Sequence, residues 1–166
     1  ALNADLFMSA NSAVLDGTIY LWTHNTPISA GQYDQDDYAI YNYLGGTGTS
    51  ASVNPGLNTE VPTGKIASGQ GFFIKGLANG NATFTNAMRV AGNNDQFFRM
   101  SQPTAQTDSN TFEKHRYWID IFNATGVFKQ NLLGYVTGGT MGIDRGMDSE
   151  VVNLTSPITL YTKVGD

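Results

Sequence analysis

Short segments in which apolar and polar residues alternate are the main pattern along this chain. These segments are rich in β-branched and aromatic residues, and residues that favour turns separate them. Because successive residues of a strand point to opposite faces of a sheet, a period of two predicts strands rather than helices. The predicted strands cover residues 18–23, 38–43, 71–75, 82–90, 96–100, 113–123, 127–136, 151–154 and 158–162.

The start of the chain is the one place where the pattern predicts a helix. Asn3 can cap the first turn, and Asp5 places a negative charge near the N-terminal end of the helix. Asn11 lies where the helix is expected to stop. We therefore predict one short N-terminal helix between Asn3 and Asn11.

Two hairpins are predicted from turn residues between strands. Asn79–Gly80 separates the strands at 71–75 and 82–90, and an Asn-Gly pair is a strong signal for a tight hairpin turn. The segment 113–123 turns into 127–136 and forms the second antiparallel pair. Since 113–123 carries large apolar residues at both odd and even positions, it is predicted to be a central strand with both faces covered.

Many short strands and one minor helix predict an all-β fold. The expected architecture is a two-sheet antiparallel β-sandwich of jelly-roll type with one short N-terminal helix. The 166 residues, of which 40% are hydrophobic, suit one core, so residues 1–166 are interpreted as a single domain. The long loop between 45 and 65 is rich in Gly, Pro and Asn and is interpreted as a binding loop or a covering flap.

Composition removes several classes of function. The net charge of −5 leaves no basic stripe for phosphates, which argues against nucleic acid and anionic membranes as partners. Cysteine is absent, so disulfides, thiolate catalysis and Cys-based zinc sites are excluded. No apolar run reaches the roughly 20 residues of a transmembrane helix.

The chain resembles a family through several runs that occur in order. The runs are Ala1–Phe7, Gly17–Pro27, Asp37–Asn42, Ile66–Lys75, Phe84–Val90, Glu113–Trp118 and Gly142–Asp148. In these runs the chain resembles the modules that precede the C-terminal sorting domain in Bacteroidetes surface proteins exported by type IX secretion. The resemblance implies an extracellular, cell-surface location, and it implies that the chain is a fragment of a larger surface protein, because such modules usually begin earlier and continue further.

A glycine-containing loop near the end of the chain carries clustered carboxylates. Asp144, Asp148 and Glu150 lie within seven residues and could supply the several oxygen ligands that calcium prefers. Their spacing differs from that of an EF-hand, and a solvated acidic loop is the alternative interpretation. Calcium is the one cofactor that the sequence suggests. A second acidic group at 34–37 is interpreted as solvated.

Aromatic residues provide the candidate ligand platform. Tyr33 and Tyr38 flank an acidic segment, and Trp22 ends a predicted strand, so these three are the candidate ligand-binding residues for a sugar ring. For Trp22, and also for Trp118, a place in the core is the alternative, and the favoured one. His24 and His115 lack the spacing of a metal site and are interpreted as structural. No catalytic residues are predicted.

These observations favour a non-catalytic extracellular adhesion or carbohydrate-binding module. The alternative is a structural module or filament subunit that assembles through open strand edges. A polysaccharide-degrading enzyme is the third and least favoured hypothesis. The expected partners are a glycan or neighbouring surface-protein domains, and a homo-oligomer fits the alternative.

Overall fold

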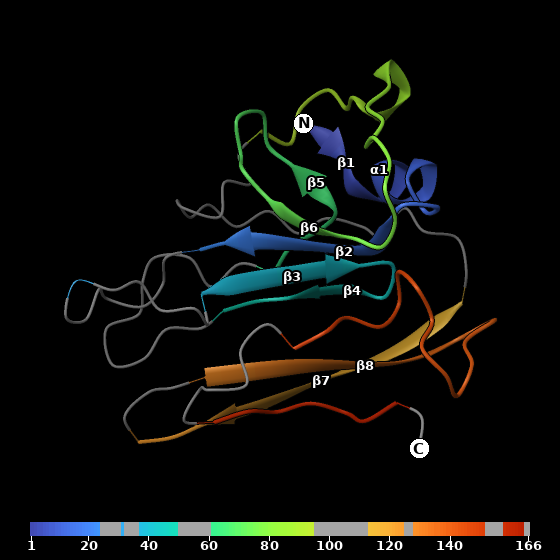
Figure 1. The fold of residues 1–166 in the computed structure, drawn as a ribbon. Helices are drawn as coiled ribbons and strands as arrows, with labels where there is room; N and C mark the ends of the chain where they lie inside the picture. The colour runs from blue at the N-terminus through green and yellow to red at the C-terminus, as the bar shows by residue number, and fades with distance from the viewer. Residues whose placement is uncertain are drawn as a thin grey trace.

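The computed structural model describes residues 1–23, 31, 37–49, 61–94, 113–124, 128–151 and 158–164 (Figure 1). Most of these residues lie in or between short strands, and one short α-helix stands near the N-terminus, so the prediction of an all-β fold is confirmed. The elements are β1 (Leu2–Asn3), α1 (Ala4–Ala10), β2 (Leu15–Trp22), β3 (Tyr38–Asn42), β4 (Gly45–Thr47), β5 (Lys65–Ile66), β6 (Phe73–Gly76), the 3-10 helix η1 (Asn86–Met88), β7 (Lys114–Phe122) and β8 (Phe128–Val136).

The N-terminal helix forms where the sequence predicts it. The side chain of Asn3 caps α1 by accepting a hydrogen bond from the backbone N–H of Leu6 at 3.2 Å. Asp5 lies in the first turn, and Asn11 is the C-terminal cap. Both predicted ends of the helix are confirmed.

The central sheet has four antiparallel strands in the order β4-β3-β2-β6. Ile19 and Leu21 of β2 are buried on the face that packs against α1, and Tyr41 of β3 lies opposite Ile19 on the same face. This face and the helix form the core of the described chain. Its buried members are Ala4, Phe7, Met8, Leu15, Ile19, Leu21, Ala39, Tyr41, Ile66 and Met88.

The strands β7 and β8 form an antiparallel hairpin whose register runs from Lys114 opposite Val136 to Phe122 opposite Phe128. The predicted pairing of these segments is confirmed. The prediction that the first of them is a central strand is wrong within the described residues, because β7 pairs there with β8 alone. The reason is that its large side chains face solvent on one side and hydrogen-bond a neighbouring strand edge on the other.

The segment 82–90 is not the predicted strand, and the turn at Asn79–Gly80 joins no hairpin. The side chain of Asn11 accepts from the backbone N–H of Thr83 at 2.6 Å and donates to its carbonyl at 3.0 Å. Both main-chain groups that a ladder would use are thereby occupied. The chain then enters η1. A third pair, β1 with β5, lies beside α1.

One loop prediction and three strand predictions remain. The predicted loop from 45 contains the short strand β4, while residues 50–60 of that loop lie outside the described residues. The segment 96–100 lies outside them as well, as do residues 152–157. Residues 158–162 are described and belong to no strand.

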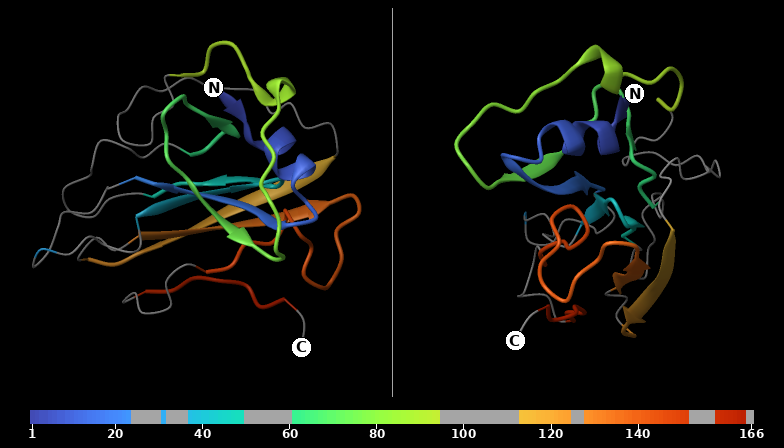
Figure 2. Two further views of the ribbon diagram at one scale, coloured as in Figure 1. Left: turned by 45° about the horizontal axis from the view of Figure 1, so that its top comes forward. Right: turned by 90° about the vertical axis from the view of Figure 1, so that its right-hand side faces the viewer.

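The elements are arranged in layers, and the chain ends lie on opposite sides of the molecule (Figures 1 and 2). The helix α1 with β1 and β5 covers one face of the central sheet. The β7–β8 hairpin and the segment 158–164 lie beyond its other face. Within the described ranges, no helix is long and apolar enough to cross a membrane.

Candidate functional site

Side chains attach the β7–β8 hairpin to the edge of the central sheet. Alternate residues of β7 share one face of the strand and donate to backbone carbonyls at and before β4. Gln130 of β8 accepts from the backbone N–H of Gly48 at 3.0 Å. The edge of β4 is therefore covered by side chains rather than by another strand. The three donors are Lys114 Nζ to Tyr43 O at 3.2 Å, Arg116 Nη1 to Leu44 O at 2.9 Å and Trp118 Nε1 to Gly46 O at 2.9 Å.

Trp118 is not the core residue that the sequence favours. Its side chain is 42% exposed, and the guanidinium carbon of Arg116 lies 5.3 Å from the centre of its ring. A cation at this distance is attracted to the face of the indole. Trp118 thus contributes a directed hydrogen bond and a stacking surface at the hairpin, in place of core volume.

The opposite face of the hairpin carries exposed apolar side chains on β7, and Asn131 and Lys129 of β8 lie on the same face opposite Ile119 and Ile121. Tyr117 is 57% exposed and Ile119 is 44% exposed, and Ile121 continues the row along β7. Tyr135 of β8 is 71% exposed and meets Tyr117 edge-to-face, with 6.2 Å between the ring centres. We call Tyr117, Ile119, Ile121 and Tyr135 the apolar hairpin face. Contiguous exposed apolar surface of this kind marks interaction sites in soluble proteins.

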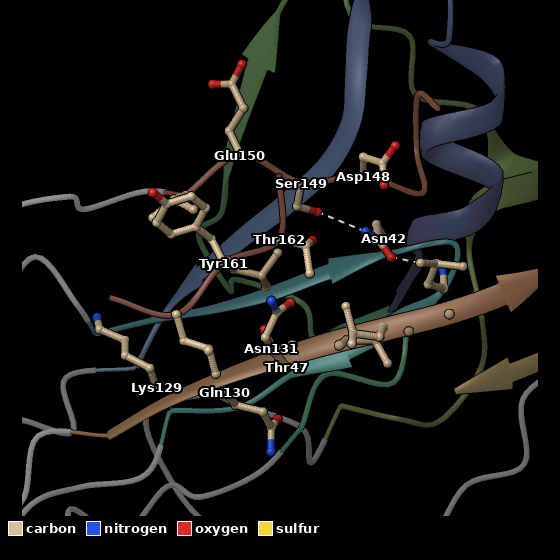
Figure 3. A pocket seen from close by; sticks show the side chains of 18 of the residues that line it. Asn42, Thr47, Lys129, Gln130, Asn131, Asp148, Ser149, Glu150, Tyr161 and Thr162 are labelled. Carbon is tan, nitrogen blue, oxygen red and sulfur yellow. Dashed lines mark hydrogen bonds between the residues drawn. The ribbon is translucent and has the colours of Figure 1, made fainter. Parts of the chain in front are cut away.

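A second feature lies between the layers, where β8 and the central sheet enclose an elongated cavity of about 420 Å³ (Figure 3). Its walls are formed by β3 and β4, by residues 128–135 of β8, by the loop 147–151 and by residues 159–164. We call this cavity the inter-layer slot. Figure 3 shows the side chains of Asn131 and Thr162 within it.

Asn42 connects the loop wall of the slot to β3. Its amide nitrogen donates to the carbonyl of Met147 at 2.6 Å and to the hydroxyl of Ser149 at 2.8 Å. Its amide oxygen accepts from the backbone N–H of Leu44 at 2.9 Å. The residue is only 7% exposed, so these bonds are shielded from water. Sequence reasoning misses Asn42 because an asparagine at a strand end has no distinctive pattern.

The candidate metal residues occupy different environments. The carboxylate of Asp144 accepts from the backbone N–H of Thr140 at 2.5 Å and from its hydroxyl at 2.8 Å. Asp148 accepts from the backbone N–H of Asp144 at 2.7 Å, while Glu150 forms an ion pair with Lys75. Among the residues that the structure describes, no group of three or more such side chains could hold a metal ion. Calcium binding stays a prediction.

Tyr20 lies near two carboxylates on the face of the central sheet opposite α1. Burial raises the pKa of its phenol to about 12, and the negative charges of Asp16 and Glu150 contribute to the same shift. The phenol is therefore neutral over the whole physiological range. Its role is structural, since it fills the sheet face.

The predicted sugar platform is brought together only in part. Trp22 and Tyr38 lie directly opposite each other on β2 and β3, and both are half-buried. The ring of Tyr38 meets Phe73 of β6 edge-to-face at 5.7 Å, and Phe73 is 61% exposed. Tyr33 lies outside the described residues, as does His24. The exposed aromatics of the hairpin were missed because large apolar residues at both odd and even positions of 113–123 resemble those of a central strand with both faces covered.

Comparison with known proteins gives one match. The family described as "Domain of unknown function (DUF8693)" matches residues 1–166. No curated protein and no solved structure matches the chain.

Proposed function

We propose that this chain, which belongs to the DUF8693 family, is a non-catalytic module of a bacterial cell-surface protein. The module contacts neighbouring protein domains, including further copies of itself, through the apolar hairpin face. The exposed row of Tyr117, Ile119 and Ile121 with Tyr135 is the observation that carries this proposal.

The energetics of a hairpin support this function. A two-stranded hairpin is marginally stable by itself in water, and here its inner face is held by side-chain hydrogen bonds to the edge of β4. The outer face remains exposed at a cost of about 25 cal/mol for each Å² of apolar surface left in water. A neighbouring domain that covers this face recovers that free energy.

The remaining parts of the proposal rest on the sequence. The resemblance to modules of type IX-exported surface proteins supports an extracellular location. The two layers on either side of the slot support a two-sheet sandwich of jelly-roll type, which the hairpin and the segment 158–164 would complete. The hydrogen bonds and the ion pair that occupy Asp144, Asp148 and Glu150 support a role other than acid–base catalysis.

Carbohydrate binding is the second candidate. Two edge-to-face aromatic pairs favour it: Tyr117 with Tyr135, both exposed, and half-buried Tyr38 with exposed Phe73. Flat aromatic surfaces of this type can stack on sugar rings. A glycan array with the purified chain tests this candidate, and the variants Tyr38→Ala and Tyr135→Ala assign any binding to one of the two pairs.

Sedimentation velocity over a range of protein concentrations tests the first candidate. We expect the wild-type chain to self-associate, and we expect the triple variant Tyr117→Thr, Ile119→Thr and Ile121→Thr to stay monomeric, because Thr keeps the strand propensity and removes the apolar area. None of these three residues lines the inter-layer slot. Ile143→Thr removes a comparably exposed apolar side chain from a loop and is the control. A monomeric wild type at every concentration, or equal association of the triple variant, would contradict assembly through this face.

A further inference from the structure

The outer edge of β8 has no strand beside it in the described chain. All nine residues of β8 pair with β7 on one edge, and no described strand pairs with the other edge. In an antiparallel strand, alternate residues direct their N–H and C=O groups toward the open edge. The inter-layer slot runs along residues 128–135 of this strand. At about 3.4 Å for each residue, the slot follows roughly 27 Å of strand.

The segment 158–164 forms the opposite wall of the slot. Within the described residues, the structure gives no hydrogen bond to any member of this segment. Its sequence, Ile-Thr-Leu-Tyr-Thr-Lys-Val, has the composition of a strand, and its first three residues are half-buried. Figure 1 shows it as an elongated stretch beside the hairpin layer. Both walls of the slot therefore present backbone groups with which a further strand could pair.

The chemistry of the lining identifies the class of occupant. Ile40 and Leu160 supply apolar side chains, Asn131, Thr47 and Thr162 supply neutral polar ones, and Lys129, Asp148 and Glu150 supply charges of both signs. The open backbone edge requires alternating main-chain donors and acceptors, which only an extended polypeptide supplies along such a length. A strand that alternates apolar and hydroxyl-bearing residues fits both the edge and the lining.

We infer that the inter-layer slot accepts one extended β-strand from a neighbouring polypeptide, which pairs with the outer edge of β8 on one side and with residues 158–164 on the other. This inference rests on the proposed function, since it names a second contact through which the module joins its neighbours. It uses the slot, whereas the proposed self-association uses the apolar hairpin face, and Tyr135 is the one residue of that face that also lines the slot.

The test measures binding of a fluorescent heptapeptide with the sequence of Ile158–Val164 to the full chain by anisotropy. The control peptide has the same side chains and carries N-methyl groups on alternate amides that face β8. Each hydrogen bond contributes modestly, so loss of two or three weakens binding about tenfold or more. Asn131→Trp fills the slot and should abolish binding. Asn79→Trp adds the same residue at an exposed turn and should leave binding unchanged.

Hydrogen exchange in the same samples identifies the site. Bound peptide should slow exchange of amides in residues 130–135 and 158–164, with no change at β6, the other edge of the central sheet. Equal binding of the methylated peptide, absence of binding, or protection of β6 instead would overturn the inference. Slow exchange along the outer edge of β8 in the free chain would also overturn it, because the segment 158–164 would then fill the slot itself. If the hairpin variants stop self-association while the peptide fails to bind, only the slot inference fails.

Discussion

Replacement of Asn42 by Ala should destabilise the wall of the slot by an amount that can be worked from three hydrogen bonds. The change removes donors to Met147 and Ser149 and the acceptor for Leu44. Asn42 is 7% exposed, so little water reaches the partners that lose their bonds. A buried polar group left unpaired costs about 1–3 kcal/mol, and the hydroxyl of Ser149 keeps a second contact with Thr18 at 3.2 Å.

The carbonyl of Met147 and the N–H of Leu44 are strongly affected, and the hydroxyl of Ser149 is weakly affected. Together they give an expected decrease of about 3 kcal/mol in the free energy of unfolding. In a chain of this size, the midpoint of thermal unfolding falls by about 2–4 °C for each kcal/mol, so we expect a decrease of about 6–12 °C. Urea unfolding followed by circular dichroism gives the free energy directly. Asn79→Ala, at an exposed turn, is the matched control and should change the midpoint little.

The variant Asn42→Asp separates the lost donors from the lost volume. Asp keeps an acceptor for Leu44 and nearly the same shape, but its carboxylate faces the carbonyl of Met147 without a proton to donate. We therefore expect Asn42→Asp to be at least as destabilising as Asn42→Ala at neutral pH. A loss below about 0.5 kcal/mol in either variant, within the range of surface substitutions, would refute the reasoning that Asn42 holds the loop.

Three further predictions concern the backbone, a phenol and the acidic loop. Gly17→Ala should lower the free energy of unfolding by about 3 kcal/mol or more, since φ is +85° and a Cβ atom would lie 2.7 Å from Cα of Gly146. Gly69→Ala is the control, because Gly69 has the same φ and a Cβ atom there would meet nothing within 4 Å, so the loss measured by urea unfolding should be smaller. Phenolate absorbance should show Tyr20 titrating near pH 12. Because the folded state favours the neutral phenol, the contribution of Tyr20 to the free energy of unfolding is complete below pH 10 and is lost as pH rises toward 12. If calcium binds the acidic loop, as the sequence predicts, chelator should lower the melting midpoint by several degrees and Asp144→Asn should abolish that decrease. An unchanged midpoint would instead leave Asp144, with its two hydrogen bonds from Thr140, in an ordinary acidic turn.

Local signals in the sequence predict the elements of this fold well. The caps of α1 at Asn3 and Asn11 depend on residues within one turn, and both are visible in the sequence. The failure at 82–90 has a distant cause. Asn11 also binds the main chain of Thr83, a contact between residues 72 positions apart, and no local pattern reports it. Periodicity assigns a residue to a face, but it does not say which partner takes up the backbone groups.

The candidate site follows the same rule. A period of two correctly separates Trp118 from Tyr117 and Ile119 on opposite faces of β7, yet it does not indicate what covers either face. What covers the inner face of β7 depends on where β4 lies and on which backbone carbonyls at and before β4 are free to accept from the side chains of β7. The predicted metal residues show the converse case. Their spacing places Asp144 and Asp148 in one loop, and it gives no sign that Glu150 pairs with Lys75.

The way the hairpin is attached explains why the slot and the apolar face occur in one layer. A strand that paired with β4 through its backbone would align the hairpin with the central sheet and fix its spacing at about 4.8 Å. Side-chain bonds from Lys114, Arg116 and Trp118 instead hold the hairpin at the edge by its face. This arrangement turns one edge of β8 toward the inter-layer slot and leaves the far face of β7 outside. Both surfaces then require a partner that the described chain does not supply, and two such surfaces on one module are what a link between neighbouring domains needs.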